Sequence, residues 1–184
     1  MSVRSAWSGS GGGTPEQVHL TWGEDPATTV VVSWVSPGRA RRPRVRIGQR
    51  VIGAAERRRI DRASGQRVWT YHARVDGLRP GATYGYAVTA DNDRGAADPF
   101  SATFTTAPGG RARFRFTSFG DLAGPDPARP APGDSQAAAA VGAVESFQPL
   151  FHLLNADPAG RGLGHANQAS AAHRPWMPVP GDHP

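Results

Sequence analysis

Three aspartates and a histidine in the second half of the chain have the side chains that a divalent metal site needs. Asp121, Asp157 and Asp182 each follow a short apolar segment, and His183 stands next to the last of them. Carboxylate oxygens and imidazole nitrogens are ligands for hard or borderline divalent cations. Two such ions bridged by a carboxylate can hold a phosphate ester and generate a hydroxide nucleophile. A single aspartate after a strand is more often a turn residue, so it is the repetition that favours metal binding.

The segments before these residues are predicted to form a small parallel sheet. A strand–helix–strand order indicates a right-handed crossover, and ligands gather outside the carboxyl ends of such strands. We therefore expect Asp121 and Asp157 to approach each other at one edge of the sheet. The predicted elements are a strand over Arg113–Phe119, a helix from Asp134 or Ser135 to about Gln148, and strands over Phe151–Asn155 and Trp176–Val179.

From Thr14 to about Ala107 the sequence alternates short apolar runs with turn residues, which is typical of an antiparallel sandwich. Apolar residues at every second position, as in Val30, Val32 and Trp34, indicate strands with one buried face. A slip of one residue would expose the whole inward set, so the alternation also predicts which side chains face the core. The aromatic residues expected to be mostly buried are Trp22, Trp34, Trp69, Tyr84 and Tyr86.

A turn that leads directly into a strand with an early tyrosine makes the sandwich type more specific. Leu78–Thr83 contains a Pro-Gly pair, and Tyr84 follows. In sandwiches of the immunoglobulin type, a tyrosine here hydrogen-bonds back to the upstream backbone, forming a tyrosine corner. This stretch resembles the fibronectin type III module, and Phe104–Pro108 resembles the end of such a module.

Five segments together resemble bacterial purple acid phosphatases, which join an N-terminal fibronectin-like domain to a calcineurin-like metallophosphoesterase domain. The resemblance implies a fibronectin type III-like antiparallel β-sandwich followed by a partial α/β metallophosphoesterase segment. Their order and spacing make the resemblance specific. The matching segments are Thr14–Val35, the turn before Tyr84, Phe114–Asp121, Phe151–Asp157 and Arg174–Pro178.

The resemblance implies a role for each of the four candidate residues. Asp121 matches the first metal-ligating aspartate of the family, and Asp157 matches the aspartate that bridges both metals. Asp182 stands where the family has a ligating asparagine, and His183 matches the histidine that contacts the substrate phosphate. The implied cofactor is a dinuclear centre of iron with zinc, manganese or a second iron, and the implied substrate is a phosphate monoester.

Two positions depart from the family pattern. Gly160 occupies the place of the tyrosine that ligates ferric iron, and Ala156 replaces the glycine before the bridging aspartate. The family's later metal-binding histidines have no match before Pro184, while His165 and His173 match no ligand and are expected to be exposed loop residues. The sequence thus predicts a truncated phosphatase that is inactive alone.

The implied organisation is a flexible leader over 1–13, a fibronectin type III-like domain over 14–107 and a truncated metallophosphoesterase domain over 111–184. One helix can shield only one face of a parallel sheet, so Phe151–Leu154 should be exposed on one side unless the sandwich or another subunit covers it. The alternative interpretation is a non-catalytic fibronectin-like binding module with a partly ordered tail. The missing tyrosine and histidine ligands favour that alternative.

The composition bears on partners and location. The 184 residues carry a formal net charge of +6 from 21 basic residues, all of them arginine, and 13 of these lie between Arg39 and Arg79. A basic cluster can bind nucleic acid, but coding bias towards arginine explains it more simply, and nucleic acid is not the expected partner. No apolar run is long enough to span a membrane. Purple acid phosphatases are commonly secreted, yet residues 1–13 lack the apolar core of a signal peptide.

Overall fold

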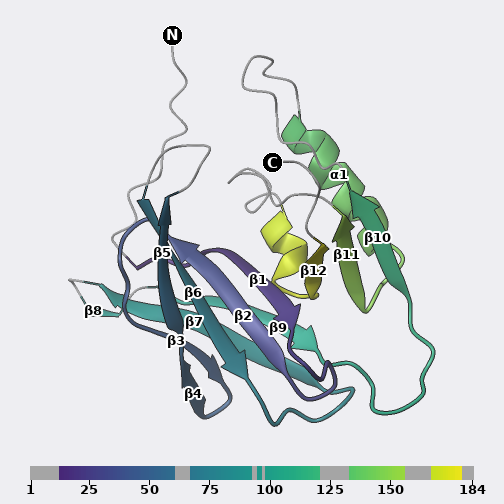
Figure 1. Ribbon diagram of the computed structural model, residues 1–184, viewed down its shortest axis with the longest axis horizontal. Helices are drawn as coiled ribbons and strands as arrows, with labels where there is room; N and C mark the ends of the chain where they lie inside the picture. Colours follow the sequence, from purple (N-terminus) through teal and green to yellow (C-terminus); the bar gives the residue numbers. More distant parts are fainter. Residues whose placement is uncertain are drawn as a thin grey trace.

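The computed structural model describes residues 13–60, 67–92, 95–96, 98–120, 133–155 and 167–179, and its first nine strands form two antiparallel sheets (Figure 1). One sheet has the strand order β1-β2-β6-β5, and the other has the order β4-β3-β7-β8 with β9 paired to β7. The strands are β1 (Glu16–Trp22), β2 (Val30–Ser36), β3 (Arg41–Ile47), β4 (Arg50–Gly53), β5 (Ala55–Ile60), β6 (Arg67–Val75), β7 (Thr83–Asn92), β8 (Gly95–Ala96) and β9 (Phe100–Thr105). The predicted sandwich is confirmed.

The inward positions of the alternating strands build the core between the two sheets. Trp34 is 1% exposed and stacks on Tyr71 with ring centroids 5.5 Å apart. Tyr86 is also buried, whereas Trp22, Trp69 and Tyr84 are half-buried at its margin. The prediction that most of these rings lie out of water therefore holds fully for two of the five. The other buried members include Val18, Leu20, Val30, Val32, Val45, Ala73, Val75, Val88 and Phe104.

The tyrosine corner is present. The backbone N–H of Arg79 donates a hydrogen bond to the Tyr84 hydroxyl at 2.7 Å. Gly81, between them, has a φ of +63°, a left-handed conformation that favours glycine. The Thr106 hydroxyl donates to the carbonyl of Arg79 at 2.7 Å and so ties the same turn to the end of β9.

The strands β4 and β5 were not predicted, and both carry arginines. Every residue of β5 is exposed, so its sequence shows no apolar alternation. Part of the basic cluster is neutralised locally, because Arg42 and Arg44 both pair with Asp91 and Arg39 pairs with Glu56 at 2.9 Å. The Arg39–Glu56 pair lies largely open to water, and surface pairs of this kind contribute little stability.

The second half of the described chain forms the predicted parallel sheet, with strand order β10-β11-β12. Helix α1 ends three residues earlier than expected, since Gln148 has a φ of +49° and Phe147 is 62% exposed. Within the described residues, no helix has the length and apolar character needed to cross a membrane. The elements are β10 (Phe116–Gly120), α1 (Gly133–Glu145), β11 (Phe151–Asn155) and β12 (Trp176–Val179), with a short helical turn over 167–171 before β12.

The parallel sheet packs against the sandwich next to β1, as Figure 1 shows. Leu20 forms an isolated parallel bridge with Pro175, and the Tyr86 hydroxyl donates to the carbonyl of Ala172 at 2.8 Å. The rings of Trp22 and Phe151 lie 4.5 Å apart. The sandwich thus covers part of β11. The sequence predicted an exposed side of Phe151–Leu154 unless the sandwich or another subunit covered it, and the sandwich provides part of that cover.

Candidate functional site at the ends of the parallel strands

The carboxyl ends of β10, β11 and β12 meet at one edge of the parallel sheet. Gly120 pairs with Asn155, and Asn155 pairs with Val179, so the three last residues lie side by side. The Asn155 amide donates to the Ser118 hydroxyl at 2.7 Å across the first two strands. This edge is where ligands bind in open α/β sheets.

Gly120 is the residue that allows β10 and β11 to approach so closely at this edge. A Cβ added to Gly120 would lie less than 3.0 Å from the backbone oxygen of Asn155, a separation that real Cβ atoms essentially never show. Any side chain at position 120 would therefore push the strand ends apart. Steric packing therefore explains why glycine precedes Asp121, independently of any metal.

The predicted site residues lie outside the described residues. This holds for Asp121, Asp157, Asp182 and His183, and also for Ala156, Gly160 and His165. Along the chain, Asp121 comes one residue after Gly120 and Asp157 comes two residues after Asn155. The part of the chain that the structure describes has no group of three or more histidine, aspartate and glutamate side chains suited to a metal ion.

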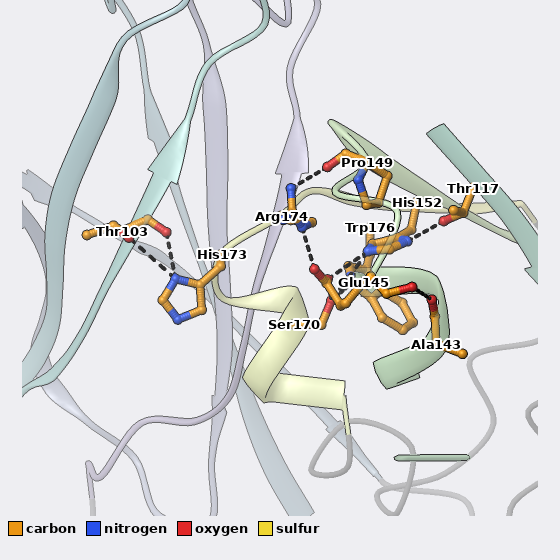
Figure 2. Close-up of polar contacts among 11 residues, drawn as sticks. Thr103, Thr117, Ala143, Glu145, Pro149, His152, Ser170, His173, Arg174 and Trp176 are labelled. Atoms are coloured by element: carbon orange, nitrogen blue, oxygen red, sulfur yellow. Dashed lines mark hydrogen bonds and ion pairs between the residues drawn. The ribbon is translucent and has the colours of Figure 1, made fainter. Parts of the chain in front are cut away.

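His173, in contrast, can be placed. It is exposed in the turn after residues 167–171, as predicted for a loop histidine. Its Nδ1 lies 2.9 Å from the carbonyl oxygen of Thr103 in β9. Figure 2 shows the ring directed towards β9 and away from the parallel sheet, so His173 helps to attach this turn to the sandwich.

A buried polar network that the sequence analysis missed lies at the amino-terminal ends of β10, β11 and β12 (Figure 2). It joins Glu145 at the end of α1, His152 in β11, Ser170 in the helical turn and Arg174 before β12. His152 is 0% exposed and contacts the rings of Phe119 and Trp176, which also contact each other. The network therefore joins α1, the helical turn and the starts of the parallel strands, at the opposite end of the sheet from the candidate site.

The hydrogen bonds of this network define the His152 tautomer. The Glu145 carboxylate can only accept, so His152 Nε2, 3.0 Å from Glu145 Oε1, carries the proton and donates it. His152 Nδ1 then accepts from the Thr117 hydroxyl at 2.5 Å. Ser170 and Arg174 also donate to Glu145, and the Trp176 indole donates to Ser170 at 3.0 Å. The network is fully connected, which is the condition for burying polar groups without a large penalty.

The residue types of serine, histidine and glutamate suggest nucleophilic catalysis, but the geometry does not support it. In such a triad the histidine lies between the hydroxyl and the carboxylate. Here Ser170 and His152 both donate to the same oxygen of Glu145. Ser170 is 5% exposed, so a substrate has no access to its hydroxyl. The network positions the sheet and performs no chemistry itself.

Burial and pairing shift the pKa values within this network. Burial lowers the pKa of His152 below its ordinary value of 6.5, although Glu145 opposes that shift. The pKa of Glu145 is also lowered, because hydrogen bonds from Ser170, Arg174 and His152 together outweigh its partial burial. Both pKa shifts therefore favour a neutral His152 imidazole beside an ionised Glu145 carboxylate.

We expect the free energy of unfolding to fall as the pH drops from about 7 towards 5. A histidine whose folded pKa lies below its unfolded value contributes its full stability above pH 6.5, and this is lost as the pH falls through the folded pKa. The slope is at most about 1.4 kcal/mol per pH unit for each such histidine. His19 and His72 act in the same direction.

Denaturant unfolding of the parent and of His152→Gln at several pH values checks this expectation. The variant should show a shallower slope below pH 6.5 and an unchanged slope near pH 8, where the His152 imidazole is neutral in both states. An identical slope for the two proteins at acid pH would show that His152 is not the titrating group.

Comparison with known proteins relates the sandwich to one family. The family described as "Purple acid Phosphatase, N-terminal domain" matches residues 15–107. Two uncharacterized proteins of Mycobacterium tuberculosis, MT2654 of strain CDC 1551 / Oshkosh and Rv2577 of strain ATCC 25618 / H37Rv, are each 34% identical over 191 residues. The alignment covers 90% of this chain and 35% of each relative, so the chain spans about a third of their length.

A solved structure supports the fold beyond the matched family region. Purple acid phosphatase PPD1 from seeds of yellow lupin (Lupinus luteus) superposes with a TM-score of 0.68 at 14% identity. The superposition covers 91% of this chain and 35% of that protein. At this identity the likeness concerns the fold alone, and its coverage is wider than the 15–107 region that the family matches.

Proposed function

The chain belongs to the purple acid phosphatase N-terminal domain family, and from this premise we propose that it takes part in metal-dependent hydrolysis of phosphate monoesters. In this proposal residues 111–184 are the first part of a metallophosphoesterase domain. The fibronectin-like sandwich supports that domain through β1 and the turn before β12.

The observation that carries the proposal is the parallel pairing of Gly120 with Asn155. Asp121 and Asp157 follow these two residues closely in sequence, so their carboxylates are expected at one sheet edge. Asp121 would ligate one metal, Asp157 would bridge two and Asp182 would complete the carboxylate set, while His183 would contact the substrate phosphate. Bound metal ions would supply Lewis acidity and a hydroxide nucleophile.

We expect the 184-residue chain to bind metal weakly and to show no turnover. Gly160 leaves the iron-ligand position without a side chain, and three carboxylates with one histidine are few donors for two ions. An incomplete ligand set leaves coordination number and geometry undefined. Binding and catalysis therefore need separate assays.

Titration with Mn²⁺, followed by electron paramagnetic resonance, tests the metal site. Asp157→Asn should weaken Mn²⁺ binding by about tenfold or more, since it removes a charged ligand. Asp98→Asn is the matched control, because Asp98 is an exposed aspartate of the sandwich. Equal affinity in the parent and in both variants would contradict the proposed site. Hydrolysis of 4-nitrophenyl phosphate that disappears in Asp157→Asn would instead show that these residues suffice for catalysis.

The second candidate function is a non-catalytic binding module. It is favoured by the confinement of the family match to residues 15–107 and by the hydrophobic core of the sandwich, to which the second half of the described chain contributes Ala172 alone. The same titration discriminates the two functions. A binding module without a metal site would bind Mn²⁺ no better as the parent chain than as the Asp157→Asn variant.

A further inference from the structure

A cavity of about 380 Å³ lies where the first sheet of the sandwich meets the parallel sheet. Its volume falls within the range of small-molecule sites, roughly 300–1,000 Å³. One wall is polar and comes from β1, β5 and β6, and the opposite wall is mainly apolar. The lining residues are Gln17, His19, Thr21, Trp34, Val35, Arg59, Thr70, His72, Leu154, Asn167, Ala171, Trp176 and Pro178.

The strand register places basic side chains together on the polar wall. His19 pairs with Ser33, which pairs in turn with His72, so the two imidazoles share one face of the sheet. On the neighbouring edge strand, Arg57 and Arg59 alternate with Arg58, which must point to the other face. The cavity wall therefore carries two imidazoles beside the Arg59 guanidinium group, and Arg57 lies on the same sheet face without lining the cavity.

An irregularity in β1 lies next to this wall. The register of β1 shifts between Glu16 and His19, and Gln17 has a φ of +52°, which is rare for a residue with a side chain. The Gln17 carbonyl lies 2.8 Å from His19 Nδ1, which can donate to it. Bulges often redirect a side chain beside a binding site, and this one sets the orientation of the His19 ring.

The positive charge at the cavity has no counter-charge among its lining residues. None of the described residues that line it is a carboxylate. Burial lowers the pKa of His72, and Arg57 and Arg59 lower it further; burial likewise lowers the pKa of His19, with added repulsion from His72 and Arg59. The basic groups are thus close enough to repel one another, and an anion between them would relieve that repulsion.

The facing wall suits the organic part of a ligand. Leu154, Ala171, Trp176 and Pro178 supply apolar surface from β11, β12 and the helical turn. Two buried polar atoms of lining residues, Trp34 Nε1 and Asn167 Oδ1, have no hydrogen-bond partner within the described part of the chain. Unpaired buried groups are costly unless a ligand or water satisfies them.

We propose that this cavity binds a small organic oxyanion, in which a phosphate or sulfonate group contacts the His19, His72 and Arg59 wall and an apolar body packs against Leu154 and Trp176. The site needs no metal and does not depend on the aspartates of the proposed phosphatase function. Failure of one proposal therefore leaves the other intact.

Titration of the 184-residue chain with phenylphosphonate in the presence of EDTA tests the site without metal ions, with tryptophan fluorescence as the readout. Arg59→Gln should weaken binding by about tenfold, the typical value of one charge-assisted hydrogen bond. Arg58→Gln, on the same strand but the other face, should change the affinity less than twofold. Methylphosphonate, which lacks the apolar body, should bind more weakly than phenylphosphonate.

Equal losses in Arg58→Gln and Arg59→Gln would reduce the effect to general charge attraction and overturn the proposal. Absence of binding at millimolar phenylphosphonate would overturn it as well. Both arginines are exposed, so neither substitution should prevent folding, and thermal unfolding of each variant verifies this.

A second measurement uses benzenesulfonate, whose charge stays constant across the pH range. The titratable and charged groups lining the cavity are His19, His72 and Arg59, with Arg57 close to His72 on the same sheet face, and the described lining residues of the parallel sheet contribute none. Affinity should rise several-fold as the pH falls from about 8 to 6, because the anion favours the protonated imidazoles. His72→Gln should flatten this dependence, and a pH-independent affinity in the parent would refute the arrangement.

Discussion

Replacing Gly120 with alanine is expected to lower the free energy of unfolding by about 2–3 kcal/mol, the cost of a steric clash that forces the backbone to shift. The new Cβ would collide with the backbone oxygen of Asn155, and a backbone atom cannot turn aside as a flexible side chain can. The strands would have to separate at the edge where the two aspartates follow. Gly120→Ala should therefore also abolish the Mn²⁺ binding attributed to Asp121 and Asp157.

Gly85→Ala provides the control for this substitution. Gly85 is also a strand glycine, but a Cβ there would meet no atom within 4 Å. Alanine at position 85 should be neutral or slightly stabilising, because it reduces the entropy of the unfolded chain. Urea unfolding of both variants measures the difference, and equal effects would mean that the close approach at Gly120 is not rigid.

Glu145→Ala is expected to destabilise the chain by about 2–3 kcal/mol, because removing one partner leaves buried polar groups without their acceptor. His152, Ser170 and Arg174 all donate to this one carboxylate. Because the Glu145 side chain is 26% exposed, water can replace some of the hydrogen bonds that the substitution removes. The loss in free energy of unfolding should therefore stay below that for a fully buried ion pair. Loss of α1 packing would follow.

The matched control is Glu24→Ala. Glu24 is 89% exposed and its ion pair with Arg74 is long, at 3.7 Å. Exposed pairs are worth roughly 0–1 kcal/mol, so this variant should unfold almost like the parent in urea. If Glu145→Ala behaved like Glu24→Ala, the network would contribute no more than a surface contact.

The sandwich could be predicted because most of its strands have a local sequence pattern that indicates a strand with a buried face. Val30, Val32 and Trp34 recur at every second position and belong to one buried core, and the tyrosine corner has a local sequence signature. The β5 strand carries no such signal, because an exposed edge strand buries neither face. Its position is decided by backbone pairing with β6, which any sequence without proline can provide.

His152 shows a different limit. It stands within an apolar run, and its neighbours in sequence reveal nothing about Glu145 and Ser170, which lie 7 and 18 residues away. A hydrogen-bond network is defined by where side chains converge, and periodicity does not encode that. The only available signal was the presence of a polar residue at a position that the pattern predicted to be buried.

The sequence by itself determined the alternating strands, the turn at Tyr84, the segments of the parallel sheet and the carboxylates that follow two of its strands, because each depends on residues close together along the chain. Only the tertiary structure decided that β1 lies beside the parallel sheet, that Gly120 allows the strand ends to approach, and that His19 and His72 face Leu154 and Trp176 across one cavity. These features arise where two separately predictable halves meet. Contact between distant segments depends on the shapes of both surfaces, and local propensity contains no information about either partner.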